Sequence, residues 1–185
     1  MKFLKRWSLH RFPWFLVFFI GAGTNAYAYI IQTYFHEMPC YYCVIDRFYL
    51  YIVALGGIIG MINPRNLFLR LVACLAFVYG SLMGTYYSYL HLNLIAKFKQ
   101  NPFTLDSCPL VFDHFYGLPQ KYFPNIFTPI GNCNAGGPSY MGLNLVEWTA
   151  VLFVTLAVIA ILVLVSQVRS IQPKRLTTTK PFSMR

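Results

Sequence analysis

The stretch that decides the fold class is LVEWTAVLFVTLAVIAILVLVSQV, residues 145–168. Its only charged side chain is Glu147, close to its start. A helix rises 1.5 Å per residue, so a run of this length is sufficient to cross a hydrocarbon core of roughly 30 Å. The stretch therefore predicts a transmembrane helix.

Three further apolar runs of comparable length precede it, at 13–34, 44–62 and 67–92. A four-residue turn, 63–66, joins the second run to the third, and a polar stretch rich in proline and glycine, 93–142, joins the third to the fourth. Within that stretch, residues 118–127 suggest a short amphipathic helix on the bilayer surface. We predict an all-α membrane protein, a four-helix transmembrane bundle in a single domain covering residues 1–185.

Composition supports the same class. The chain is 57% hydrophobic and only 11% charged, which is typical of a small polytopic membrane protein and excludes a soluble domain. Its formal charge of +10 would suggest nucleic acid if it formed a patch on a soluble fold. Here the basic residues flank apolar runs, so the expected partner is the lipid bilayer and no nucleic acid.

Orientation follows from the distribution of the 15 lysines and arginines. The short loop 35–43 has none, and the long loop 93–142 has only Lys97, Lys99 and Lys121. Most of the others lie in the two termini or flank the 63–66 turn: Lys2, Lys5, Arg6, Arg11, Arg65, Arg70, Arg169, Lys174, Arg175, Lys180 and Arg185. We expect both termini in the cytoplasm and both loops on the outer face, where disulfides persist.

The tripeptide Ala26-Tyr27-Ala28 is an alternative to an intact first span, because it resembles a signal-peptidase site. The apolar run before it is already long and continues through residues 29–31. An uncleaved first span is therefore the favoured interpretation.

Four of the five cysteines fall in the two outer loops. Cys40 and Cys43 form a C-x-x-C motif, and Cys108 and Cys133 are the candidates for a second pair. If a helix begins near Cys43, its unsatisfied N–H groups and dipole favour a thiolate there. Arg47 lies four residues later on the same helix face, inside an apolar run, where an arginine needs a partner. The Cys43 thiolate and a polar oxygen of a lipid-soluble cofactor are two candidates.

Simpler explanations exist for each feature. Arg47 could pair with Asp46 or with a lipid phosphate, and the second cysteine pair could be a stabilising disulfide. A metal site would need Cys108, Cys133, His36 or His114 as further ligands, but the 25 residues between Cys108 and Cys133 are unlike a zinc knuckle, so no metal is expected. Mobility of the long loop would instead let its disulfide meet both a soluble partner and the first pair.

Two residues in the third apolar run are treated separately. His91 lies at its outer end and suits either an interfacial cap or a hydrogen bond to a cofactor headgroup near Arg47. Cys74 lies near its cytoplasmic end, roughly 25 Å along a helix from His91, so it cannot bridge to the other cysteines. We expect Cys74 to be a small buried residue.

Several motifs together resemble the bacterial disulfide bond formation protein B (DsbB) family of inner-membrane thiol:quinone oxidoreductases. The resemblance covers nearly the whole chain. It rests on Pro39-Cys40-x-x-Cys43 followed by an acid and Arg47, the stretch from Gly84 to His91, Pro102-Phe103-Thr104 before Cys108, Gly131-Asn132-Cys133, Gly142-Leu143 with Trp148, and Ser166-Gln167.

The resemblance implies a relay with ubiquinone or menaquinone as cofactor and a periplasmic DsbA-like thioredoxin-fold oxidase as partner. By family analogy the partner's thiolate attacks Cys108, Cys133 is released to engage Cys40, and Cys43 forms a thiolate complex with the quinone. Arg47 would stabilise that thiolate and a quinone oxygen, and His91 is a further candidate for the quinone pocket.

This sequence departs from the family pattern in having Asp46 where glutamate is more usual, a longer segment between His91 and Cys108, and the extra Cys74. The longer segment leaves open whether the partner is a general or a dedicated oxidase. Two rival functions differ in their predictions. A vitamin K epoxide reductase-like enzyme usually carries its C-x-x-C late in the chain, whereas here it opens the second span. A scaffold or metal-handling protein predicts no dependence on quinone.

Overall fold

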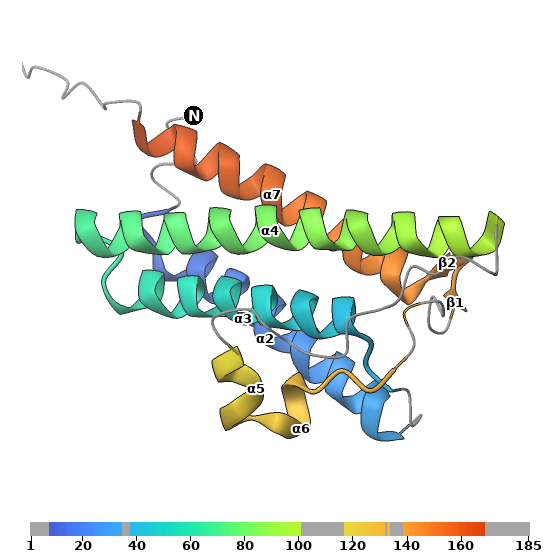
Figure 1. Ribbon diagram of the computed structural model, residues 1–185. Coiled ribbons are helices and arrows are strands. Elements are labelled where there is room, and N and C mark those ends of the chain that lie inside the picture. Colours follow the sequence, from blue (N-terminus) through green and yellow to red (C-terminus); the bar gives the residue numbers. More distant parts are fainter. Residues whose placement is uncertain (1–7, 35–37, 101–116, 132, 134–138, 169–185) are drawn as a thin grey trace, which may run out of the picture.

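The computed structural model describes residues 8–34, 38–100, 117–131, 133 and 139–168. These residues contain four long helices, α2 (Arg11–Tyr34), α3 (Tyr41–Ile62), α4 (Leu67–Gln100) and α7 (Leu145–Val168), shown in Figure 1. Each of the four is long and apolar enough to cross a membrane, judged by length and composition. The predicted all-α, four-helix membrane fold is confirmed.

The helices pack in a simple order. α3 packs against both α2 and α4, and α4 packs against α7. In Figure 1, α2 begins and α7 ends at the end of the bundle where α3 connects to α4. The first turn of α3 lies toward the opposite end, on the side of the short strands. The cysteine motif at the start of α3 is therefore far from the α3–α4 connection.

Three helix ends differ from the predicted spans. α2 begins at Arg11, two residues before the predicted start of the first span. α3 begins at Tyr41, with Cys40 as its N-cap, so the helix starts before the apolar run at residue 44. α4 continues to Gln100, beyond the predicted end of its span at Leu92. The apolar run ends at Leu92, but no glycine or proline follows until Pro102, so the helical backbone has no reason to stop there.

Where the sequence predicted one short helix over 118–127, the structure has two, α5 (Leu118–Tyr122) and α6 (Pro124–Phe127). They separate at Phe123, which leaves the helical region because it precedes a proline. A two-stranded antiparallel hairpin, β1 (Ser139–Tyr140) with β2 (Leu143–Asn144), leads into α7. Its two central residues, Met141 and Gly142, have φ of 55° and 84°, as a tight hairpin turn requires.

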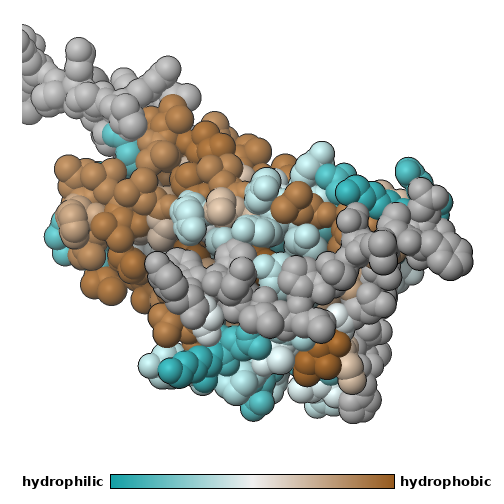
Figure 2. Space-filling view, in the orientation of Figure 1, coloured by the Kyte–Doolittle hydropathy of each residue, from teal (hydrophilic) through white to brown (hydrophobic). Residues whose placement is uncertain are grey.

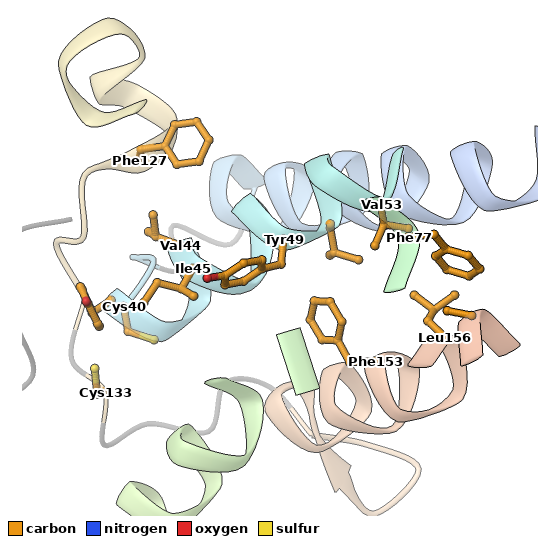
Figure 3. Close-up of a cluster of buried hydrophobic side chains, with 13 residues drawn as sticks. Cys40, Val44, Ile45, Tyr49, Val53, Phe77, Phe127, Cys133, Phe153 and Leu156 are labelled. Carbon is orange, nitrogen blue, oxygen red and sulfur yellow. The ribbon is translucent and has the colours of Figure 1, made fainter. Parts of the chain in front are cut away.

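A buried cluster joins α3, α4, α6 and α7 (Figure 3). Val44, Ile45, Val53 and Phe153 are each 0% exposed. At one point α7 approaches α4 closely, because a Cβ on Gly84 would lie 2.1 Å from the Phe153 ring. Cys40, the N-cap of α3, belongs to this cluster, and Cys43 in the first turn packs against it.

The outer surface is largely apolar, as lipid contact requires. Figure 2 shows hydrophobic residues over α7 and over one end of α4 in that view, while hydrophilic residues gather over α5 and at the other end of α4. Exposed side chains on α4 and α7 include Leu71, Leu75, Val151, Val154 and Val158. Such a surface is stable only in a bilayer or a detergent.

Candidate active site

Cys40 and Cys43 form a compact pair at the start of α3. Cys40 is the N-cap, and its Sγ accepts a hydrogen bond of 3.3 Å from the backbone N–H of Cys43. The two Sγ atoms also share a hydrogen bond, at a separation of 2.7 Å. Both cysteines are free thiols in this structure. Oxidation to a disulfide needs only a small approach of the two sulfurs.

The thiol of Cys40 has an altered acidity. Its hydrogen bond with the Cys43 side chain lowers the pKa of Cys40 below the ordinary value, although burial opposes this shift. The backbone N–H of Cys43 acts in the same direction. The sequence predicted the thiolate at Cys43, whereas the hydrogen bonds of the reduced pair favour it at Cys40. The main reason is the hydrogen bond from the Cys43 thiol, and the capping position adds a helix N–H that Cys40 accepts.

His91 lies beside this pair of cysteines. Its Nε2 is 3.7 Å from Cys40 Sγ, and its ring stacks on Tyr42 with centroids 5.1 Å apart. The imidazole is 0% exposed. Its Nδ1 makes no hydrogen bond of good geometry within the described residues, although the Cys133 backbone lies close enough to interact with the ring. His91 therefore contacts the Cys40 side of the motif.

Arg47 is a buried cation oriented by α2. It is only 9% exposed, and it donates hydrogen bonds of 2.6 Å to Gln32 Oε1 and 3.2 Å to the Ala28 carbonyl. Cys43 is an electrostatic neighbour of its guanidinium, as the spacing of one helical turn predicts. Since Arg47 has five N–H donors, these two bonds leave donors for a further acceptor. A buried cation is thus held next to a reactive thiol.

Asp46 does not pair with Arg47. Its Oδ1 accepts a hydrogen bond of 3.2 Å from Ser88 of α4, and the carboxyl is 5% exposed. Both side chains belong to the described part of the chain, and no ion pair joins them there. The simpler explanation of Arg47 as the counter-ion of Asp46 is therefore wrong. Consecutive residues on a helix point in directions about 100° apart, which sends Arg47 toward α2 and Asp46 toward α4.

Cys133 reaches the same site from the long loop. It is 0% exposed and belongs to the buried cluster that contains Cys40, and Figure 3 shows the two side chains as neighbours. Cys133 is in a disulfide. Cys108, its predicted partner, lies outside the described residues. The sequence suggested a mobile loop, but the described residues around Cys133 pack against the start of α3.

The donor atoms of Cys40, Cys43 and His91 all lie within 4.8 Å of one another, a spacing that a metal ion can bridge. A closed structural zinc site takes four ligands, and no fourth histidine, cysteine or carboxylate joins this group within the described ranges. His36 and His114, two ligands considered from the sequence, lie outside those ranges. The described geometry therefore fits a hydrogen-bonded dithiol better than a metal site.

Sequence reasoning missed two residues of the site, Gln32 and Ser88. Gln32 carried a usable signal, because it is an uncharged polar side chain near the end of an apolar run. Ser88 carried none, since serines are common on the helix surfaces of membrane bundles. Cys74 is buried and free on α4, as predicted.

Comparison with known proteins assigns the family. The family model described as "Disulfide bond formation protein DsbB" matches residues 10–163, a range that includes the C-x-x-C motif, Arg47, His91 and Cys133. The chain belongs to the DsbB family. Family membership together with four apolar helices makes it a membrane oxidoreductase that acts on thiols and generates disulfides.

Relatives in this family cover most of the chain. The disulfide bond formation protein B of Haemophilus influenzae strain Rd is 32% identical over 176 residues, 95% of this chain and 97% of the relative. The protein of the same name from Pasteurella multocida is 30% identical over the same shares. The protein-disulfide oxidoreductase DsbI of Lelliottia amnigena is 35% identical over 148 residues, 76% of this chain and 66% of that relative.

Proposed function

We propose that this DsbB-family chain reoxidises a periplasmic DsbA-like thiol oxidase and passes two electrons to a membrane quinone, ubiquinone or menaquinone. The observation that supports this most directly is the meeting of two cysteine systems at one buried point. Cys133, which is in a disulfide, packs in the same cluster as Cys40, whose sulfur is 2.7 Å from that of Cys43. A relay needs this adjacency, because thiol–disulfide exchange requires sulfur-to-sulfur contact.

The relay conserves atoms and electrons at each exchange. The partner's thiolate attacks Cys108, a disulfide forms between them, and Cys133 leaves as a thiolate. Cys133 then attacks Cys40 of the oxidised Cys40–Cys43 pair, and Cys43 leaves as a thiolate beside Arg47. The second thiol of the partner displaces Cys108 and completes the partner's disulfide. The partner loses two electrons and two protons in all, and the chain holds the electrons as the thiols or thiolates of Cys43 and Cys108, with one disulfide, Cys40–Cys133, remaining.

Arg47 fits the binding of a quinone. Its charge is buried, has no carboxylate partner among the described residues, and lies next to Cys43, which is partly exposed. The remaining N–H donors suit a carbonyl oxygen, and the guanidinium also stabilises a Cys43 thiolate. A bound quinone supplies an acceptor for two electrons and two protons. Because His91 contacts Cys40, we assign it to the dithiol end of this pocket.

Energetics explain the need for a lipid-soluble acceptor. A DsbA-type dithiol is strongly oxidising, at about −120 mV, and each 30 mV uphill costs about 1.4 kcal/mol for two electrons. Soluble thiol carriers at lower potentials cannot reoxidise it. A quinone lies within the bilayer, and Cys43 and Arg47 belong to a helix that is long and apolar enough to cross one.

The proposed location is the bacterial inner membrane, with both termini cytoplasmic and the four relay cysteines periplasmic. The bundle supports a shared side, because Cys40 and Cys133 lie together near the end opposite the α3–α4 connection. A membrane-impermeant maleimide added to reduced intact cells should label single cysteines placed in the loop 93–142. It should not label a cysteine placed in the 63–66 turn, and labelling of the turn would reverse the orientation.

The function is tested by following oxidation of a reduced DsbA-like protein by the purified chain, with ubiquinone and menaquinone in separate reactions. We expect catalytic, quinone-dependent turnover that is lost in Cys43→Ser and in Cys108→Ser. Cys74→Ala is the matched control and should keep its turnover, because Cys74 packs with Trp14 and Ala73 in a separate cluster. Turnover that persists without quinone, or that requires added Zn²⁺, would reject the relay in favour of a metal-handling role.

A further inference from the structure

The segment before Cys133 is tied to the residue before Cys40. The backbone N–H of Ile130 and that of Gly131 both donate to the carbonyl oxygen of Pro39, at 3.0 and 2.9 Å. Pro39 immediately precedes the N-cap of α3, and Gly131 is two residues before Cys133. One carbonyl thus joins the two cysteine segments through the backbone.

Gly131 makes this contact possible. A Cβ at residue 131 would lie 2.0 Å from the Met38 carbonyl oxygen and 2.7 Å from its carbonyl carbon. Both are backbone atoms, so they cannot move aside as a flexible side chain does. Any other residue at this position must push the segment away from Met38 and Pro39. By contrast, a Cβ on Gly23 of α2 meets nothing within 4 Å.

A second contact holds the same segment on its N-terminal side. Phe127, at the end of α6, is 7% exposed and packs its ring on Phe48 and Tyr51 of α3, with centroids 6.2 and 6.1 Å apart. The segment from Phe127 to Gly131 is thus attached to α3 at one end and to Pro39 at the other. Cys133 lies two residues after Gly131 and is fully buried.

This attachment matters for the chemistry because Cys40 and Cys133 are far apart in sequence. A free loop of that length visits many positions, so the thiol of Cys133 meets that of Cys40 at a low effective concentration. Restricting the segment to one position converts the encounter into a local one and increases the rate of exchange. The gain is lost if the segment moves by even one or two ångströms.

We propose that the backbone of Ile130 and Gly131, bound to the Pro39 carbonyl, is the positioning element that presents Cys133 to Cys40. Its role in turnover rests on the proposed function. In the exchange, the Cys133 thiolate attacks Sγ of Cys40, the Cys40–Cys133 bond forms, and the Cys40–Cys43 bond breaks with Cys43 leaving as a thiolate. Gly131 touches no reacting atom and acts through the segment it holds.

The test uses a full-length chain with Cys43→Ala, Cys74→Ala and Cys108→Ser, in which Cys40 and Cys133 are the remaining cysteines. Oxidised glutathione is the oxidant, and the rate of the Cys40–Cys133 disulfide is measured by peptide mass spectrometry. We expect Gly131→Ala to slow this cross-link at least fivefold and Gly23→Ala to leave it unchanged. A slowing of less than fivefold in Gly131→Ala overturns the proposal.

A second variant removes one hydrogen bond without adding a clash at residue 131. Ile130→Pro deletes the N–H that donates to Pro39, while Ile130→Ala keeps it, and the Ile130 side chain is already 63% exposed. We expect slower cross-linking in Ile130→Pro and the parent rate in Ile130→Ala. Equal rates in these two variants would contradict a role for the backbone contact.

A local effect is separated from general damage by a chain that keeps Cys40 and Cys43 but has Cys133→Ala, Cys74→Ala and Cys108→Ser. Gly131→Ala should not change the rate at which the Cys40–Cys43 disulfide forms in this background. If it slows both disulfides equally, Gly131 supports the start of α3 in general, and the positioning role is wrong.

The cross-link needs neither a partner nor a quinone, so its outcome is independent of the proposed function. Absence of quinone-dependent turnover in the wild type, with a slow cross-link in Gly131→Ala, rejects the relay and supports the positioning element. Normal turnover, with an unchanged cross-link in Gly131→Ala, rejects only the positioning element.

Discussion

The guanidinium of Arg47 donates a hydrogen bond of 2.6 Å to Oε1 of Gln32, which lies on the neighbouring helix α2. A second bond of 3.2 Å, to the Ala28 carbonyl, comes from the same helix. Arg47 therefore does not depend on its sequence neighbour Asp46 for orientation. α2 supplies the contacts that orient this buried cation near Cys43.

Removal of the Arg47 charge should affect the reaction with quinone and not the exchange with the partner. Arg47→Ala is expected to raise the apparent KM for quinone at least tenfold, because both the thiolate and the carbonyl oxygen lose their cation. Exchange of the Cys108–Cys133 pair with a reduced partner should be unchanged, since Arg47 is bonded to α2. Steady-state turnover at varied quinone concentration measures the apparent KM, and trapping of the mixed disulfide measures the exchange with the partner. An unchanged KM for quinone would contradict the role of Arg47 in quinone binding.

Gln32 should act through Arg47 and not by itself. Gln32→Ala is expected to raise the apparent KM for quinone about threefold to tenfold, because Arg47 loses its shortest hydrogen bond. In the Arg47→Ala background the same change should have no further effect. Thr24→Ala is the control on α2, since the Thr24 hydroxyl bonds only to its own helix at Ile20. Additive effects of Gln32→Ala and Arg47→Ala would show that Gln32 does not work by holding Arg47.

The acidity of Cys40 should depend on Cys43. The hydrogen bond with Cys43 lowers the pKa of the Cys40 thiol, so removing it must raise that pKa. In Cys43→Ala, the midpoint of Cys40 alkylation by iodoacetamide should move to higher pH, and the rate at neutral pH should fall because less thiolate is present. Cys74→Ala should leave the profile in place. A midpoint that stays constant or moves to lower pH in Cys43→Ala would refute this explanation.

Ser88 should stabilise the bundle by satisfying the buried Asp46 carboxyl. Ser88→Ala removes the hydroxyl that bonds to Asp46 and is expected to lower the free energy of unfolding by about 1–3 kcal/mol. Ser81→Ala is the matched control on α4. Ser81 is also 0% exposed, but its hydroxyl bonds within its own helix, to the Phe77 carbonyl. Thermal unfolding in detergent should show a smaller loss for Ser81→Ala, and equal losses would contradict the role of the Asp46 bond.

Gly84 should be required for the close packing of α4 on α7. Gly84→Ala places a methyl group 2.1 Å from the Phe153 ring and is expected to destabilise the fold by about 1–3 kcal/mol, despite the better helix propensity of alanine. Gly23→Ala, where the methyl meets nothing within 4 Å, should be neutral or slightly stabilising. The melting temperatures of the two variants provide the comparison. A Gly84→Ala protein as stable as Gly23→Ala would disprove this packing argument.

Local patterns in the sequence were enough for the helices and for the pairing of Cys43 with Arg47. Long apolar runs specify membrane spans because an apolar helix of that length is stable in the hydrocarbon core wherever it occurs in the chain. A helical turn brings residues four apart onto one face, so Cys43 and Arg47 had to be neighbours once α3 formed. Residues within one helix are therefore predictable from spacing alone.

Contacts between helices and loops were decided by the tertiary structure. Nothing in the spacing of His91, Ser88 or Gln32 shows that His91 contacts Cys40, that Ser88 binds Asp46, or that Gln32 holds Arg47. These contacts depend on the rotation of each helix about its axis and on the depth at which it packs, which the sum of all side-chain contacts fixes. The two backbone bonds from Ile130 and Gly131 to Pro39 likewise join segments far apart in the sequence, so no local pattern predicts them. The sequence by itself determined the four apolar spans and the placing of Cys43 and Arg47 on one helix face, because those properties are local, whereas the meeting of Cys40, His91 and Cys133 at one buried point is a property of the packed bundle.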